Sequence, residues 1–371
     1  MRRQGVMCRA LLCAFAVHSS IAAPVQDHFT IANEYVCLQF DGTTGNLISL
    51  EDKVQSLSVV SADLSPDSPP PSSVDVWGLA LVGAGGELAV SSRGTVTAAL
   101  SRDGGSQVLS MLWSDVDIVS SQENGTRAVA AIDVRLSVAL PDNSALSAWQ
   151  LGLTVKEIHR RTVPVGVWEA SINVPAGVAD TEGGELFYPT GFGVTYSNPG
   201  VSAGPSLSST YPSGSASMQY MAAGRKGLAS GLYMAAVDPI GEAKNMDYAA
   251  PSVESSSYMR IKIFPEDAGV AIPTGGSWAA PYSVSVGVIT GIDTAAGRPM
   301  WAEGALLYKQ WALRSARWTQ DGPLSARLDE FPAWFTETSV WINSHWQCHD
   351  IFNAVHELYV CVFYRSILTY P

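Results

Sequence analysis

Apolar and polar residues alternate along nearly every periodic segment between residues 28 and about 290, and this alternation limits the fold more than any other feature of the chain. In the clearest run, Arg127 to Leu140, four apolar residues alternate with polar ones and so share one face of an extended chain: Ile132, Val134, Leu136 and Val138. Glycine, proline and Asp-Asn separate such runs, as is typical of antiparallel sandwiches. We therefore predict that residues 24–295 form one large two-sheet antiparallel β-sandwich.

The first run predicts a β-hairpin within residues 29–53. Val36–Phe40 alternates in polarity, and residues 41–45 (DGTTG) supply two glycines that can adopt positive φ in a turn. Two other stretches, 61–73 and 196–217, are rich in serine, glycine and proline and are predicted to be loops.

The pattern changes near residue 296. After Pro299, the segment WAEGALLYKQWALRSARW predicts a helix, because proline is tolerated in a first turn and four aromatic residues share one helical stripe: Trp301, Tyr308, Trp311 and Trp318. Gly322 and Pro323 are expected to end this helix, and residues 338–343 to form a short apolar strand. We therefore predict a second domain over residues 296–371.

Residues 1–22 have the features of a signal peptide, with a basic start, a short apolar core and small residues before the cleavage point. No later segment reaches about 18 consecutive apolar residues, so we expect a secreted or extracellular protein without a membrane span. Asn124 begins an Asn-Gly-Thr glycosylation sequon. After the signal, Cys37, Cys348 and Cys361 allow at most one disulfide.

The charge of the chain argues against a nucleic-acid partner. The formal net charge is −12, and no basic cluster follows the signal peptide, whereas phosphate backbones require clustered Lys and Arg. Charged residues make up only 15% of the chain, and glycine, serine, alanine and valine take their place. Such a surface is compatible with a neutral polar ligand such as a sugar.

Four segments resemble a group of secreted glycoside-hydrolase-like proteins: LFYPTGFGVTYSNPG (186–200), GLYMAAVDPIGEAKNM (231–246), YKQWALRSARW (308–318) and VWINSHWQCHDIFN (340–353). In that group, whose function is unassigned, a galactose-mutarotase-like β-supersandwich precedes a (β/α)8 barrel. The resemblance covers roughly residues 28–353. It implies a carbohydrate partner, either a polysaccharide or an oligosaccharide.

The same resemblance implies that residues 296–371 hold a linker helix and the first strand of a barrel. A complete barrel takes about 250 residues, so we expect this barrel to be incomplete, from either a truncated gene model or a degenerate copy. Glycosidases use two carboxylates that flank the sugar bond. We expect that pair to be absent, and the sequence leaves open whether the chain is an enzyme.

Asn343, His345 and Trp346 follow the predicted barrel strand, on the face where barrel active sites form. One interpretation is a wall of a sugar pocket, with tryptophan stacked on a pyranose and the polar side chains bonded to its hydroxyls. The other interpretation is packing within an incomplete barrel.

Three charged residues of the sandwich are further candidates for sugar binding. Asp238 and Lys244 lie in VDPIGEAKN, where they could offer an acid–base pair to a sugar, or Asp238 could cap the turn. Glu169 follows Trp168 on a predicted strand, where mutarotase-type catalysis would use an acid of this kind. That catalysis also requires a histidine, and His159 is expected in the turn between Lys156 and Arg161 instead. The alternative is that Glu169 faces solvent on its strand.

The histidines and Cys348 between residues 345 and 356 fit no established spacing of metal ligands. We therefore expect neither a metal nor another cofactor. Two functions remain open. The chain is either the N-terminal portion of a glycoside-hydrolase-like protein that acts on or binds carbohydrate, or a non-catalytic carbohydrate-binding or accessory sandwich.

Overall fold

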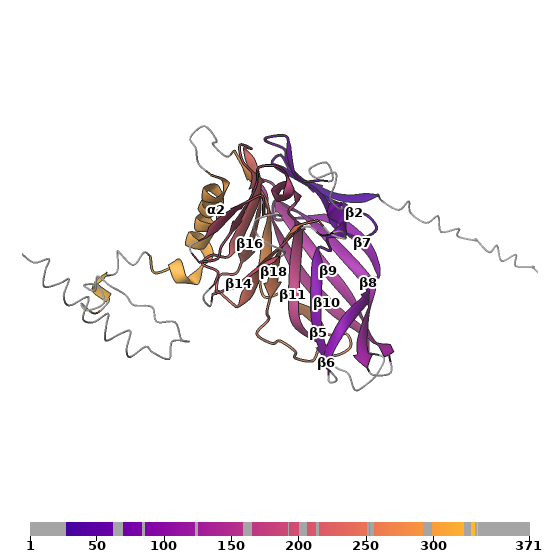
Figure 1. The fold of residues 1–371 in the computed structure, drawn as a ribbon. Helices are drawn as coiled ribbons and strands as arrows, with labels where there is room; N and C mark the ends of the chain where they lie inside the picture. The colour runs from indigo at the N-terminus through magenta and orange to yellow at the C-terminus, as the bar shows by residue number, and fades with distance from the viewer. Residues whose placement is uncertain are drawn as a thin grey trace, which may run out of the picture. The chain divides into compact units, whose positions relative to one another are not determined.

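The structure is a computed structural model, and it describes these residues: 27–61, 70–83, 86–122, 125–158, 165–191, 193–199, 206–212, 215–250, 252, 256–291, 299–322, 328–330 and 332. They contain twenty β-strands and one α-helix, α2 (Met300–Ser315), besides short 3-10 turns. The strands form an antiparallel sheet of four strands and one of sixteen (Figure 1). The mainly β, antiparallel fold that the alternation predicts is confirmed.

The four-stranded sheet contains the predicted hairpin. Its strands follow chain order, as β1 (His28–Ala32), β2 (Val36–Asp41), β3 (Leu47–Asp52) and β4 (Leu57–Val60). Gly45 has a φ of 74° in the turn between β2 and β3, and a side chain there would collide with the indole of Trp113. Glycine is therefore required at this turn for both conformation and space.

The sixteen-stranded sheet contains all the described strands from β5 to β20. Its strands are β5 (Trp77–Gly83), β6 (Gly86–Ser92), β7 (Thr95–Asp103), β8 (Ser106–Gln122), β9 (Gly125–Pro141), β10 (Leu146–Ile158), β11 (Gly166–Pro175), β12 (Gly184–Tyr188), β13 (Val194–Ser197), β14 (Ser206–Tyr211), β15 (Tyr220–Arg225), β16 (Ser230–Val237), β17 (Lys244–Ala249), β18 (Tyr258–Ile263), β19 (Ser277–Ala279) and β20 (Ser283–Thr290). The order is β13-β12-β15-β16-β20-β10-β9-β8-β6-β5-β11-β18-β17-β14, with β19 on β10 and β7 on β8.

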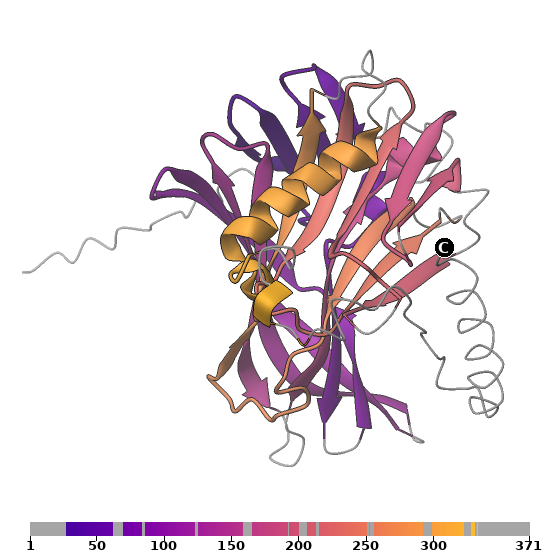
Figure 2. The same ribbon diagram turned by 90° about the vertical axis from the view of Figure 1, so that its left-hand side faces the viewer.

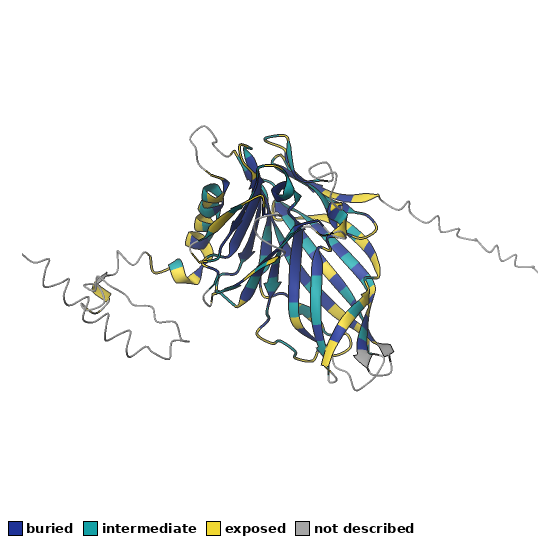
Figure 3. Ribbon diagram, viewed as in Figure 1, coloured by how far each residue is buried: buried dark blue, intermediate teal, exposed yellow. Residues whose placement is uncertain are grey.

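The large sheet folds back so that its own faces enclose the core. The hydroxyl of Tyr188, on β12, donates to the carbonyl of Met246, on β17, across 2.6 Å, so strands near opposite ends of the order lie against each other. The small sheet adds to the same core, because the rings of Phe40 and Trp149 lie 5.6 Å apart. Buried residues alternate with half-buried or exposed ones along most of β9 and β10 (Figure 3). One face of these strands is therefore left outside the core.

Helix α2 covers β15, β16 and β20 (Figure 2). Tyr220 of β15 anchors it: its ring stacks on Tyr308 with centroids 5.6 Å apart, and its hydroxyl donates to the carbonyl of Trp301. Gly304 permits this approach, because a side chain there would lie 3.0 Å from the Tyr220 ring. Two members of the predicted aromatic stripe, Trp301 and Tyr308, therefore stack on rings of the sandwich.

Two sequence predictions are wrong in detail. Residues 196–217 contain β14 and the end of β13, although they were expected to be a loop. Strand β14 pairs only with β17 at the edge of the sheet, so it needs no continuous apolar face. The helix ends at Ser315 instead of reaching Trp318, because Ala316 is extended and the backbone N–H of Arg317 donates to the carbonyl of Pro239.

The predicted barrel strand at 338–343 lies outside the described residues, so the incomplete barrel and the domain boundary near residue 296 stay predictions. None of the helices in the described part of the chain is long and apolar enough to cross a membrane. Cys37 is a free, half-buried thiol.

Candidate functional site

A cleft of about 360 Å³ lies against the outer face of β9 and β10, beside the short strand β19. Its lining combines charged, hydroxyl, amide and aromatic residues, which include Asp133, Arg135, Ser137, Gln150, Thr154 and Trp278. A few convergent polar groups in a concave site are the usual signature of a small-ligand pocket. This cleft, called here the β9–β10 cleft, is the candidate site.

The register of β9 and β10 builds the floor of the cleft. Three successive cross-strand pairs place their side chains on the outer face: Asp133 with Thr154, Arg135 with Gly152, and Ser137 with Gln150. The intervening residues, such as Val134 and Leu151, are buried in the core. The alternation that buries one face therefore gathers the polar residues on the other.

Gly152 leaves open space beside Arg135. In a strand pair, side chains of directly opposed residues lie next to each other, and here the residue opposite Arg135 has none. A side chain at Gly152 would also meet the carbonyl oxygen of Trp278 at 3.1 Å. Gly152 therefore allows β19 to approach closely, and it places no side chain opposite the guanidinium of Arg135.

Lys156 neutralises the acidic end of the cleft. Its ammonium lies 2.8 Å from Oδ1 of Asp115 and 3.5 Å from Oδ1 of Asp133. Asp115 has a positive φ of 57° at an irregularity of β8, and its backbone N–H donates to Asp133. The hydrogen bond to Asp115 is the main cause that raises the pKa of Lys156. The carboxylates of Asp115 and Asp133 therefore both have partners within the protein.

Gln150 and Trp278 lie at the edge of the β9–β10 cleft. The side-chain amide of Gln150 donates to the carbonyl of Ala280, just beyond β19. Trp278 is half-buried and packs against the core. Trp278 also lines a second cleft of about 390 Å³, together with Glu242, Glu266 and Asp267. Burial, followed by the charges of Asp238 and Glu266, raises the pKa of Glu242.

Asp238 and Lys244 form a buried ion pair. The Lys244 ammonium lies 2.7 Å from Oδ2 of Asp238, and their side chains are 0% and 1% exposed. The Asp238 carboxylate also accepts the backbone N–H groups of Ile240, Gly241 and Glu242. The turn-capping interpretation of Asp238 is therefore confirmed, while a role of either residue in sugar binding stays a prediction.

Glu169 lies on β11 and pairs with Lys262 of β18 across 3.1 Å. A register shift between Val167 and Glu169 marks a β-bulge, and Trp168 within it is 54% exposed. His159 lies outside the described residues, and a role of Glu169 in sugar binding stays a prediction.

The candidates Asn343, His345 and Trp346 lie outside the described residues, as does the sequon residue Asn124. The described part of the chain contains no group of three or more His, Cys, Asp or Glu that could hold a metal ion. Sequence reasoning missed Gln150 and Trp278 as site residues. The polar residues of the run from Arg127 to Leu140, which include Asp133 and Arg135, served there only as evidence of alternation. Two opposite charges on one outer face were nevertheless a signal for a site.

A further cavity of about 530 Å³ lies beside α2. It is lined by residues of the loop before β10, of β20 and of the helix, among them Leu146, Thr290, Leu307 and Trp311. The indole N–H of Trp311 and the hydroxyl of Thr290 are buried there without a hydrogen-bond partner in the described structure. This cavity, called here the α2 groove, is the alternative place for a ligand.

No family model matches the sequence. A protein of Monosiga brevicollis named "Putative glycoside hydrolase" is 38% identical over 225 residues, which are 60% of this chain and 17% of that protein. The chain thus spans less than a fifth of that relative. The sequence resemblance to glycoside-hydrolase-like proteins is confirmed by this relative.

Two solved structures similar to this fold are carbohydrate enzymes by name. One is an α-N-acetylgalactosaminidase of Bifidobacterium bifidum in complex with Gal-NHAc-DNJ, with 12% identity, a TM-score of 0.46, and coverage of 72% of this chain and 37% of that one. The other is a galactose mutarotase-related enzyme of Lactobacillus acidophilus, with 9% identity, a TM-score of 0.41, and coverage of 72% and 98%.

Proposed function

We propose that this chain is the carbohydrate-binding β-sandwich of a glycoside-hydrolase-like protein, and that it holds a sugar in the β9–β10 cleft. The observation that carries the proposal is the polar floor of three cross-strand pairs beside Trp278. Hydroxyl, amide and guanidinium groups bond to sugar hydroxyls, and an aromatic wall excludes water from an apolar sugar face. The glycoside-hydrolase name of the Monosiga brevicollis relative supports the ligand class.

The proposal is tested by screening the full chain against a glycan array and measuring the best ligand by calorimetry. Gln150→Ala is expected to weaken binding, because the side chain lines the cleft and holds the backbone beyond β19. Gln107→Ala is the matched control, because Gln107 likewise donates to a backbone carbonyl, that of Ala32, but lies outside the cleft. Equal affinity of both variants and the parent would contradict the site.

Secretion belongs to the same proposal, and its support is the signal-like sequence of residues 1–22. Expression of the full chain in a eukaryotic secretory cell is expected to release a protein into the medium that begins near Ala23. Recovery of the chain only inside the cell, with Met1 or Arg2 at its N-terminus, would contradict this part of the proposal.

A further inference from the structure

Arg135 is an unpaired cation in the β9–β10 cleft. It is exposed, and it makes no hydrogen bond or ion pair with any residue that the structure describes. Six other cations of the sandwich are paired with carboxylates: Arg93 with Asp75, Arg102 with Asp142, Lys156 with Asp115, Lys244 with Asp238, Arg260 with Asp247 and Lys262 with Glu169. The guanidinium of Arg135 therefore remains available for a ligand.

The nearest acid on the same strand face does not serve as a partner for Arg135. Asp133 lies two residues away, but its Oδ1 accepts the backbone N–H of Asp115 and lies 3.5 Å from the Lys156 ammonium. The residue opposite Arg135 is Gly152, which has no side chain to cover it. The centre of the cleft thus presents five guanidinium N–H donors and the hydroxyl of Ser137.

This surplus of donors favours a ligand that brings acceptors and negative charge. A planar guanidinium matches a carboxylate or a sulfate ester through two parallel hydrogen bonds, and such charge-assisted bonds are roughly twice as strong as neutral ones. The chain as a whole carries a formal net charge of −12. The net negative charge of the chain therefore repels an anionic ligand in general. Selection of such a ligand must come from a local contact with Arg135.

We infer that the β9–β10 cleft selects acidic saccharides, whose carboxylate or sulfate group binds Arg135 while Ser137, Gln150 and Thr154 bond to ring hydroxyls. This inference rests on the proposed function and names the ligand class for the same cleft. The carboxylate of a uronic acid and a sulfate ester share the recognition chemistry.

The test is a calorimetric titration of the full chain with three oligosaccharides of equal length: an oligogalacturonate, a neutral galacto-oligosaccharide and its sulfated form. The acidic ligands are expected to bind more tightly than the neutral one. Arg135→Gln is expected to reduce acidic-ligand affinity by roughly 10- to 100-fold, because a charge-assisted hydrogen bond is lost. Its effect on affinity for the neutral ligand is expected to be smaller, because glutamine still offers an amide donor to a hydroxyl but carries no charge.

Two further variants separate charge from geometry and from general surface charge. Arg135→Lys keeps the charge but loses the planar fork, and is expected to recover only part of the affinity. Arg225→Gln removes an exposed arginine at the end of β15, outside the cleft, and is expected to behave as the parent. The affinities for the oligogalacturonate and for the sulfated oligosaccharide show whether Arg135 prefers a carboxylate or a sulfate ester.

Each outcome decides between the two proposals. Equal binding of neutral and acidic ligands, with no effect of Arg135→Gln, would overturn the selection of acidic sugars and leave carbohydrate binding in place. A loss of acidic-ligand affinity in Arg225→Gln as large as in Arg135→Gln would overturn it as well. Failure of all three ligands and of the glycan array would remove the proposed function itself.

Discussion

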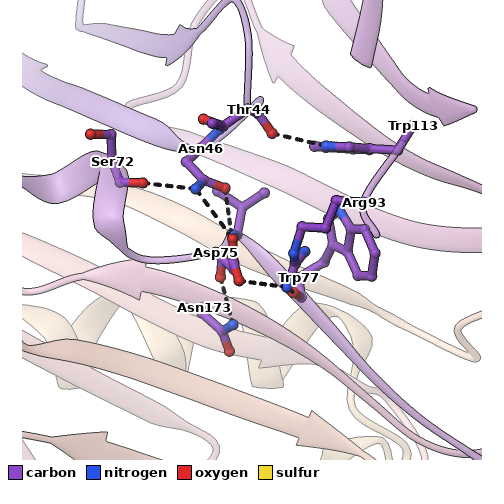
Figure 4. A network of polar contacts seen from close by, with 9 residues as sticks. Thr44, Asn46, Ser72, Asp75, Trp77, Arg93, Trp113 and Asn173 are labelled. Atoms are coloured by element: carbon purple, nitrogen blue, oxygen red, sulfur yellow. Dashed lines mark hydrogen bonds and ion pairs between the residues drawn. The ribbon is translucent and has the colours of Figure 1, made fainter. Parts of the chain in front are cut away.

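The guanidinium of Arg93 lies over the indole of Trp77, with its central carbon 4.0 Å from the ring centroid (Figure 4). The Nη2 atom of Arg93 is also 2.7 Å from Asp75 and donates to the carbonyl of Trp77. Asp75 accepts a hydrogen bond from Asn46, which precedes β3 of the small sheet, and the Asp75 carbonyl accepts one from Asn173 on β11. This network ties the small sheet to the large one.

Arg93→Lys is expected to lower the free energy of unfolding by about 1–3 kcal/mol, because an ammonium cannot both stack on Trp77 and keep the two polar contacts. Urea denaturation measures the change. Arg102→Lys is the control, since the Arg102–Asp142 pair is largely exposed, and its effect should stay below about 1 kcal/mol. Equal effects of the two substitutions would show that the network adds no stability.

Lys244→Met is expected to destabilise the fold by about 3–5 kcal/mol, because it leaves the Asp238 carboxylate buried without its cation. The double variant with Asp238→Asn should recover part of this loss, since the buried charge is then gone. Lys262→Met, at the partly exposed pair with Glu169, serves as the comparison. Chemical denaturation in which Lys244→Met is no worse than Lys262→Met would contradict the role of burial.

Asp238 also illustrates how far the sequence could predict the structure. Asp-Pro followed by glycine predicted a capped turn, and the sandwich followed from alternation at positions such as Ile132 and Val134, because local patterns determine both. The cleft depends on β9–β10 register, which sets Arg135 opposite Gly152 and is not encoded in either strand alone. The serine-rich β14 was missed because it is stabilised by pairing with β17.

Tyr220→Ala is expected to lower stability by about 3–5 kcal/mol and to loosen α2. The substitution removes a ring that stacks on Phe187, Tyr233 and Tyr308 and a hydroxyl that bonds to the carbonyl of Trp301. Hydrogen exchange of the helix amides should accelerate more than that of β9. Leu313→Ala, at a side chain 59% exposed on the same helix, should change neither the stability nor the hydrogen exchange of the helix amides. Unaltered helix protection in Tyr220→Ala would contradict this docking.

Asp180 is expected to make stability fall as pH rises through the acidic range. Burial raises the pKa of this carboxyl above its ordinary value of 3.8, although Ser257 and Tyr248 hydrogen-bond to it. Between the ordinary and the raised pKa the folded state binds more protons than the unfolded state, so stability is greater at the lower pH. Urea titrations across this range should show a flatter pH dependence for Asp180→Asn. A dependence identical to that of the parent would contradict the assignment.

A crystal structure of the full chain with its tightest-binding acidic oligosaccharide tests the central claim most directly. We predict that the acidic group of the sugar contacts Arg135 and that its ring lies over the pairs Ser137–Gln150 and Asp133–Thr154 in the β9–β10 cleft. A sugar bound only in the α2 groove, against Thr290 and Trp311, with the β9–β10 cleft empty, would contradict the account.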